Sequence, residues 1–226
     1  MSLMQQPIYE QAVLFLAALV VFTSFLMLAQ RRLFPLIGLF AWQGLLLAGT
    51  TALVAFDRDY PHLYLSALLT LLIKTVLIPW MLRRWIIQLD VHRDVESLLY
   101  PSYVMGAASA LVLFSYYVVL PIERLSTLAT RNAIAVSFAV VLLGMLLMIS
   151  RRQAVTHVIG FMSIENGLFF AAVTATSGMP MVVELGVAFD VLVAAVLFGV
   201  FFFHIRSSID SLDVDQMNRL HEVDHG

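Results

Sequence analysis

Residues 154–175 read AVTHVIGFMSIENGLFFAAVTA, an almost wholly apolar run with Glu165 near its centre. An α-helix needs about 20 apolar residues to cross the hydrocarbon core of a bilayer, which is about 30 Å thick. Continuous runs of this length, without the alternation of barrel strands, are typical of membrane-spanning helices. The stretch therefore predicts a transmembrane helix with an ionisable side chain at mid-depth.

Further apolar stretches of similar length lie on both sides of this one, each ended by charged residues, proline or a polar cluster. The predicted spans are 11–29, 33–56, 62–82, 99–120, 130–149, 154–175 and 180–204. The 226-residue chain is 61% hydrophobic and 12% charged, with a mean hydropathy of +0.92. Soluble domains are about 45–50% apolar and about 25% charged. We therefore expect an all-α membrane helix bundle of about seven spans and exclude a soluble globular domain.

Arginine residues lie mainly on one side of the predicted spans. That side carries Arg31, Arg32, Arg83, Arg84, Arg93, Arg151, Arg152, Arg206 and Arg219. The opposite side carries Arg58, Arg124 and Arg131. Because positive residues accumulate on the cytoplasmic side of membrane proteins, this distribution predicts an N-terminus outside and a C-terminus in the cytoplasm.

Two polar segments remain outside the predicted spans. Residues 83–99 carry apolar side chains at helical spacing opposite charged ones, which predicts a short amphipathic helix on the membrane surface or, alternatively, a solvated loop. Residues 207–226 are acidic and polar. We expect this tail to be an arm docked on a partner or to be disordered.

Several classes of chemistry are excluded by what the chain lacks. It has no cysteine, so it has no disulfides, thiolate zinc sites or cysteine-ligated nickel or iron–sulfur centres of its own. The glycine-rich nucleotide-binding signatures, the serine-hydrolase elbow and the zinc-protease motif are also missing. A net charge of −2 gives no reason to expect nucleic-acid binding. No catalytic constellation is visible, and we expect no catalytic residues on this chain.

Four acidic or lysine residues lie within the predicted spans: Lys74, Glu165, Glu184 and Asp190. An acid or a lysine at the centre of a membrane helix costs roughly 2.5–3.5 kcal/mol, so such residues usually face a bundle interior or a wet cavity on an ion path. At a rise of about 1.5 Å per residue, Lys74, Glu165 and Asp190 all lie near the bilayer midplane. We interpret these three as a proton relay, and the alternative is a structural ion pair.

Two weaker relay candidates lie closer to the membrane surfaces. Glu184 is near the outer end of its predicted helix, where a negative charge at a helix N-terminus is favourable, so a capping role competes with a relay role. His157 lies two turns from Glu165 toward the cytoplasm. Because imidazole titrates near neutral pH, His157 is a candidate entry point for protons, or alternatively an interfacial cap.

The segment FMSIENG at 161–167 resembles the glutamate-bearing second helix of the small three-helix proton-channel subunit of respiratory complex I. In that family a third helix holds a second mid-membrane acid and is followed by the tripeptide Ile-Asp-Ser. Here Asp190 lies in that helix, and Ile209-Asp210-Ser211 follows it. Residues 130–211 therefore resemble that module. One departure is that the family has a glutamate where this chain has Asp190.

The seven-helix pattern as a whole is similar to component E of hydrogenase-4, from the membrane-bound group 4 NiFe hydrogenases and formate hydrogenlyase-type complexes, which are relatives of complex I. The segments that carry this resemblance are Arg151-Arg152-Gln153-Ala154, Glu165-Asn166-Gly167, Met179-Pro180 and Val183-Glu184-Leu185-Gly186-Val187. The resemblance divides the chain into a four-helix extension over 1–125, a module like the complex I small subunit over 126–206, and the tail over 207–226.

The resemblance implies a non-catalytic membrane subunit of a proton-translocating hydrogenase complex in a bacterial or archaeal cytoplasmic (inner) membrane. Its implied partners are antiporter-like membrane subunits and a peripheral hydrogenase arm, in contact with lipid and not with nucleic acid. No cofactor is expected on this chain, whereas Ni-Fe and Fe-S centres are expected on partner subunits. Two alternatives stay open: a C-type subunit of a multisubunit cation/proton antiporter, and a non-translocating structural membrane anchor.

Overall fold

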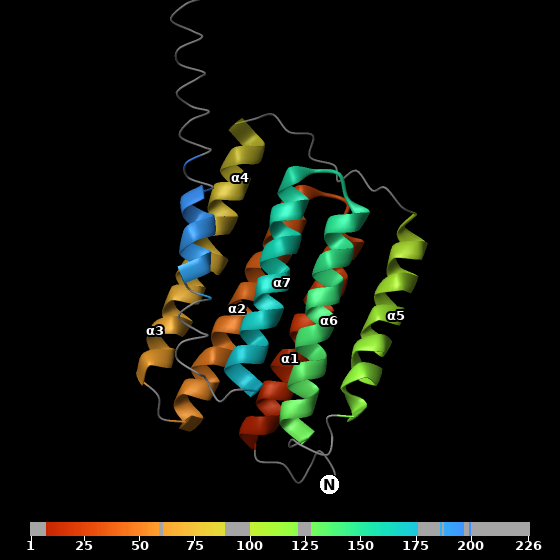
Figure 1. The fold of residues 1–226 in the computed structure, drawn as a ribbon. Helices are drawn as coiled ribbons and strands as arrows, with labels where there is room; N and C mark the ends of the chain where they lie inside the picture. Colours follow the sequence, from red (N-terminus) through yellow and green to blue (C-terminus); the bar gives the residue numbers. More distant parts are fainter. Residues whose placement is uncertain are drawn as a thin grey trace, which may run out of the picture.

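The computed structural model describes residues 8–58, 61–88, 100–121, 128–175, 186, 188–196 and 199. These residues form a helix bundle (Figure 1). Its elements are α1 (Ile8–Ala29), α2 (Leu33–Arg58), α3 (Pro61–Thr70), η2 (Leu71–Leu77), α4 (Ile78–Gln88), α5 (Pro101–Val119), α6 (Leu128–Ser150) and α7 (Ala154–Ala175). Residues 188–196 are also helical. The segments α3, η2 and α4 follow one another without a break and are called the third helix below.

Six helices in the described part of the chain are long and apolar enough to cross a membrane. They run over Ile8–Ala29, Leu33–Asp57, Leu63–Gln88, Pro101–Val119, Asn132–Ser150 and Ala154–Thr174. They confirm a multi-pass, all-α architecture, and their positions agree with the first six predicted spans. Of the seventh predicted span, 180–204, the structure describes only 186, 188–196 and 199, so a seventh crossing and the orientation of the termini stay predictions.

The third helix is longer than the sequence analysis predicted. It continues to Gln88, so residues 83–88 belong to a helix that begins on the far side of the bundle. Arginine is a good helix former, and its long side chain can reach the polar surface from a membrane helix. Arg84 also lies over the ring of Trp80, with 5.8 Å between its guanidinium carbon and the ring centre. The rest of the predicted amphipathic segment, 89–99, and the tail 207–226 lie outside the described residues.

The third helix widens into a π turn at its centre. The backbone N–H of Ile78 donates to the carbonyl oxygen of Ile73, five residues earlier, at the end of η2. Pro79 follows directly, and a proline lacks an N–H and crowds the carbonyl four residues before it in a regular α-helix. A wider turn gives that carbonyl more room. Such π turns are frequent at functional sites, and Lys74 lies in the middle of this one.

The helix α2 has a central position in the bundle. It packs against α1, against the third helix and against α7. Figure 1 shows α5 at one edge of the bundle and the third helix at the other. A side chain on α2 can therefore reach both the helix that carries Lys74 and the helix that carries Glu165.

The pair α6 and α7 packs at backbone distance. A Cβ atom on Gly167 would lie 2.9 Å from the carbonyl oxygen of Ser137, and one on Gly144 would lie 2.9 Å from the carbonyl oxygen of Gly160. Small residues allow membrane helices to approach this closely. The close packing sets the rotation of α7, and with it the direction in which Glu165 points.

Candidate functional site

Lys74 meets both of the mid-membrane acids. Its Nζ donates a hydrogen bond to Oε2 of Glu165 and lies 3.3 Å from Oδ1 of Asp190. The side chains of Lys74 and Asp190 are 0% exposed and that of Glu165 is 12% exposed. The three residues come from the third helix, from α7 and from the helical residues 188–196. The structure thus brings together the three relay candidates that the sequence predicted at one depth.

Asn166 gives the ammonium a neutral partner. Its Oδ1 accepts a hydrogen bond from Lys74 Nζ at 2.7 Å. The ring of Phe169 lies 5.3 Å from the same nitrogen, a distance at which an aromatic face attracts a cation. Glu165 and Asn166 thus accept hydrogen bonds from the ammonium, and Asp190 lies beside it as an ion-pair partner.

The cluster of Lys74, Glu165 and Asp190 carries a formal charge of −1 when all three groups are ionised. Within the described residues, Oε1 of Glu165 and both carboxyl oxygens of Asp190 accept no hydrogen bond. A buried charge without compensation is costly, and one proton on either acid makes the cluster neutral. The arrangement can therefore hold one exchangeable proton that is shared between two acids.

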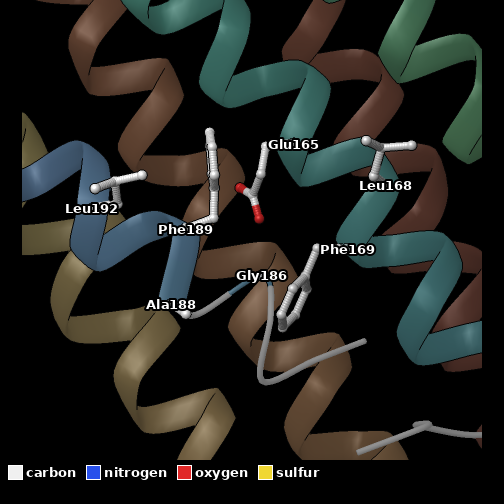
Figure 2. Close-up of a pocket in the computed structure, with 7 residues that line it drawn as sticks. All are labelled: Glu165, Leu168, Phe169, Gly186, Ala188, Phe189 and Leu192. Atoms are coloured by element: carbon white, nitrogen blue, oxygen red, sulfur yellow. The ribbon is translucent and has the colours of Figure 1, made fainter. Parts of the chain in front are cut away.

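A pocket of about 500 Å³ lies beside Glu165. Its described lining residues are Glu165, Leu168, Phe169, Gly186, Ala188, Phe189 and Leu192. Figure 2 shows the carboxylate of Glu165 in the space between Phe189 and Phe169, near Gly186. Among these lining residues Glu165 alone has a polar side chain. The pocket therefore borders the side chain of Glu165, whereas the side chains of Lys74 and Asp190 are fully buried.

A chain of uncharged polar side chains extends from Asn166 into the bundle. Nδ2 of Asn166 donates to Oε1 of Gln43 at 2.9 Å. Nε2 of Gln43 donates to the hydroxyl oxygens of Ser24, at 2.8 Å, and Ser163, at 3.2 Å. All four side chains are buried. They connect α1, α2 and α7 to the lysine on the third helix.

This chain was not predicted from the sequence, because only charged residues stand out within the apolar spans. A signal was present, because Gln43 places a primary amide in the middle of the second apolar run. A buried amide is costly without hydrogen-bond partners, so such a residue indicates a polar neighbour on another helix. In the same way, Pro79 in the third run indicated an irregular turn near Lys74.

Of the two weaker candidates the structure describes His157, which lies apart from the cluster. His157 lies near the start of α7, about 12 Å along the helix axis from Glu165. Its Nδ1 is 2.8 Å from the carbonyl oxygen of Gln153, a local contact at the beginning of the helix. Glu184 lies outside the described residues.

The fold and the site together define a multi-pass helical membrane protein with a charged cluster buried in its bundle. The chain is 29% identical over 209 residues to the uncharacterized protein Rv0085 of Mycobacterium tuberculosis, covering 92% of this chain and 95% of that protein. It is 23% identical over 205 residues to hydrogenase-4 component E of Escherichia coli K12, and the match covers 91% of this chain and 95% of that protein. No family model and no solved structure matches it. The chain is thus a distant homologue of hydrogenase-4 component E over most of its length, which supports a membrane family of that type.

Proposed function

We propose that this chain is a membrane subunit of a multisubunit hydrogenase complex, in which Glu165 and Asp190 pass protons beside Lys74. The distant homology to hydrogenase-4 component E, over 91% of the chain, supports the first part. One observation carries the second part. A fully buried acid, Asp190, and a partly buried one, Glu165, meet a single ammonium from separate helices, which leaves one negative charge for a proton to neutralise.

The position of Lys74 favours a proton over a metal cation as the ion that is carried. The ammonium lies between the two acids, where a cation would otherwise bind. A second unit charge about 4 Å from it is repelled by about 4 kcal/mol at an effective dielectric constant of about 20. A proton avoids this repulsion because it forms a neutral carboxyl group on one acid.

Glu165 is the acid through which we propose that protons enter or leave the cluster. Its side chain lines the pocket, whereas Asp190 is fully buried. A proton that binds to Glu165 removes its charge and weakens its ion pair with Lys74. The ammonium then pairs more strongly with Asp190, and protonation of Asp190 has the opposite effect. In this way Lys74 couples the two acids.

We also propose a location and a topology for the chain. It lies in a bacterial or archaeal cytoplasmic membrane, with a seventh span over 180–204, the N-terminus outside and a complex I-like module over 126–206. The partners are further membrane subunits and a peripheral hydrogenase arm. Because the chain has no cysteine to ligate them, nickel–iron and iron–sulfur centres belong to those partners.

Neutral variants of the two acids in the assembled complex test proton transfer. Glu165→Gln and Asp190→Asn keep the side-chain shape and remove the charge, and Glu10→Gln, in the first turn of α1, is the matched control. Proton translocation and hydrogen turnover are measured in inverted membrane vesicles, together with subunit assembly. We expect lost or uncoupled translocation in the first two variants and wild-type behaviour in the control. Normal translocation in both acid variants would favour the structural anchor.

Purification under mild conditions tests membership in a hydrogenase complex. The tagged chain is extracted in mild detergent, and the subunits and metals that accompany it are identified. We expect a hydrogenase-type large subunit together with nickel and iron. Antiporter-type membrane subunits without these metals would favour the antiporter alternative.

A further inference from the structure

The side chain of Phe169 contacts both the pocket and the charged cluster. It is one of the residues that line the pocket of about 500 Å³. The centre of its ring also lies 5.3 Å from Nζ of Lys74. Phe169 itself is only 3% exposed and Lys74 is 0% exposed, so little more than the pocket-facing part of the ring is uncovered. The ring therefore lies between the pocket and the lysine.

The pocket borders the cluster at one residue. Of the three charged side chains, Glu165 lines the pocket, whereas Lys74 and Asp190 do not. Figure 2 shows the rings of Phe169 and Phe189 near the carboxylate of Glu165. An apolar ring offers water no hydrogen-bond partner, and hydrophobic constrictions in membrane proteins close water paths in this way. The ring of Phe169 is thus placed to keep water in the pocket away from Lys74.

Gly186 packs against the edge of this ring. A Cβ atom on Gly186 would lie 2.8 Å from Cδ2 and 3.3 Å from Cε2 of Phe169, and 3.4 Å from Oε1 of Glu165. Any other residue at this position would force the ring or the backbone to shift. Gly186 precedes Asp190 by four residues, about one helical turn. The segment that carries the buried acid therefore supports the ring through a contact that only glycine allows.

We propose that Phe169 is a positioning residue whose ring, held in place by Gly186, closes the pocket off from Lys74. Water and small solutes in the pocket then reach Lys74 only when the ring moves. This inference deepens the proposed function, because it makes Glu165 the member of the cluster that meets the pocket first. That order of proton transfer rests on the proposed function, whereas the closure of the pocket toward Lys74 does not.

The reactivity of Lys74 tests this closure, because Lys74 is the single lysine among 226 residues. The full chain in lipid nanodiscs is treated with formaldehyde and a borane reductant, which methylate accessible lysine amines, and mass spectrometry measures the rate at Lys74. Buried groups react through local opening, so we expect methylation about tenfold faster in Phe169→Ala than in the wild-type chain. Phe170→Ala is the matched control. Phe170 is the next residue, is 0% exposed, belongs to the same apolar core and does not line the pocket.

A second pair of variants tests the contact with Gly186 and serves if Phe169→Ala does not fold. Gly186→Ala places a Cβ atom where the ring edge lies, so we expect faster methylation of Lys74. Gly199→Ala is its control, because a Cβ atom there would meet nothing within 4 Å. We expect the wild-type rate in this control.

Equal rates in Phe169→Ala and Phe170→Ala would overturn the inference, since the ring would then matter only for stability. Equal rates in Gly186→Ala and Gly199→Ala would reject the role of Gly186. A wild-type chain that reacts as fast as the chain denatured in detergent would also overturn the inference. Proton translocation by Glu165→Gln separates it from the proposed function. Normal translocation there rejects the proposed function and leaves the closure standing, whereas lost translocation with equal methylation rates rejects only the closure.

Discussion

Gly44 lies directly against Lys74. A Cβ atom on Gly44 would lie 3.0 Å from Cβ of Lys74 and 3.3 Å from its carbonyl carbon. Partners on two other helices hold the lysine side chain, so Lys74 cannot move away from α2 without stretching those contacts. The close approach of α2 to the π turn therefore depends on glycine at this position.

We expect Gly44→Ala to destabilise the protein. Adding a methyl group to a tightly packed contact typically costs about 1–3 kcal/mol, and here it also displaces the cluster. Gly49→Ala is the matched control, because Gly49 is on the same helix and a Cβ there would meet nothing within 4 Å. Thermal unfolding in detergent measures the stability of both variants. Equal midpoints for the two variants would show that α2 and the third helix can separate without cost.

We expect Lys74→Met to be more destabilising than the loss of all three charges together. Removing one partner of a buried ion pair typically costs about 3–5 kcal/mol, because the remaining charge is left uncompensated. In Lys74→Met two acids would face each other without a cation. Adding Glu165→Gln and Asp190→Asn removes that repulsion and should recover most of the lost stability. The measurement is the unfolding midpoint of the single and triple variants. A triple variant that is no more stable than the single one would contradict the charge argument.

Hydropathy alone was sufficient to predict the six apolar helices that the structure describes, and counting along the chain predicted the depth of the relay candidates. Both are local properties, since about 20 apolar residues span the bilayer and each residue advances about 1.5 Å. The shared depth of Lys74, Glu165 and Asp190 therefore followed from counting along the chain. Whether the three side chains face one another depends on helix rotation, and this is set by contacts such as Gly44 against Lys74 and Gly167 against Ser137. Those contacts join residues far apart in the sequence.

The uncharged part of the site was harder to predict for a different reason. A charge in a membrane helix is costly wherever it points, so Lys74 was informative by itself. An amide or a hydroxyl is less specific, because serine and threonine in helices often bond to their own backbone, as Thr51 does to Leu47. Gln43 indicates from the sequence only that a polar partner lies on another helix, and the structure identifies the partners on α1 and α7.

Arg151 joins two helix ends, and we expect its loss to be costly. Its Nη2 donates to the carbonyl oxygens of Leu28, at 2.7 Å, and Gln30, at 3.0 Å, at the end of α1 where carbonyls lack helical partners. Burial, together with the neighbouring Arg31, lowers the pKa of Arg151, so desolvation offsets part of the gain. Arg151→Ala should reduce the free energy of unfolding by about 1.5–3 kcal/mol.

Arg152 is the matched control for this prediction, because it is the next residue and is exposed. Arg152→Ala should change the free energy of unfolding by less than about 0.5 kcal/mol, as is usual for surface positions. Chemical unfolding of the two variants in the same detergent provides the comparison. A loss as large for Arg152→Ala as for Arg151→Ala would mean that positive charge in this loop matters, and not the bonds to α1.

The orientation of the chain can be tested with single cysteines, because the natural sequence has none. Ala154 begins α7 and Leu120 follows α5; both are exposed, and the length of α6 separates them. Since nine of the twelve arginines lie on the side of Ala154, we expect a membrane-impermeant maleimide to label Ala154→Cys from the cytoplasmic side and Leu120→Cys from outside. Reversed labelling would contradict the predicted orientation. It would leave the cluster in place, because Lys74 lies near the middle of the third helix, and would reverse only the direction of the proposed proton transfer.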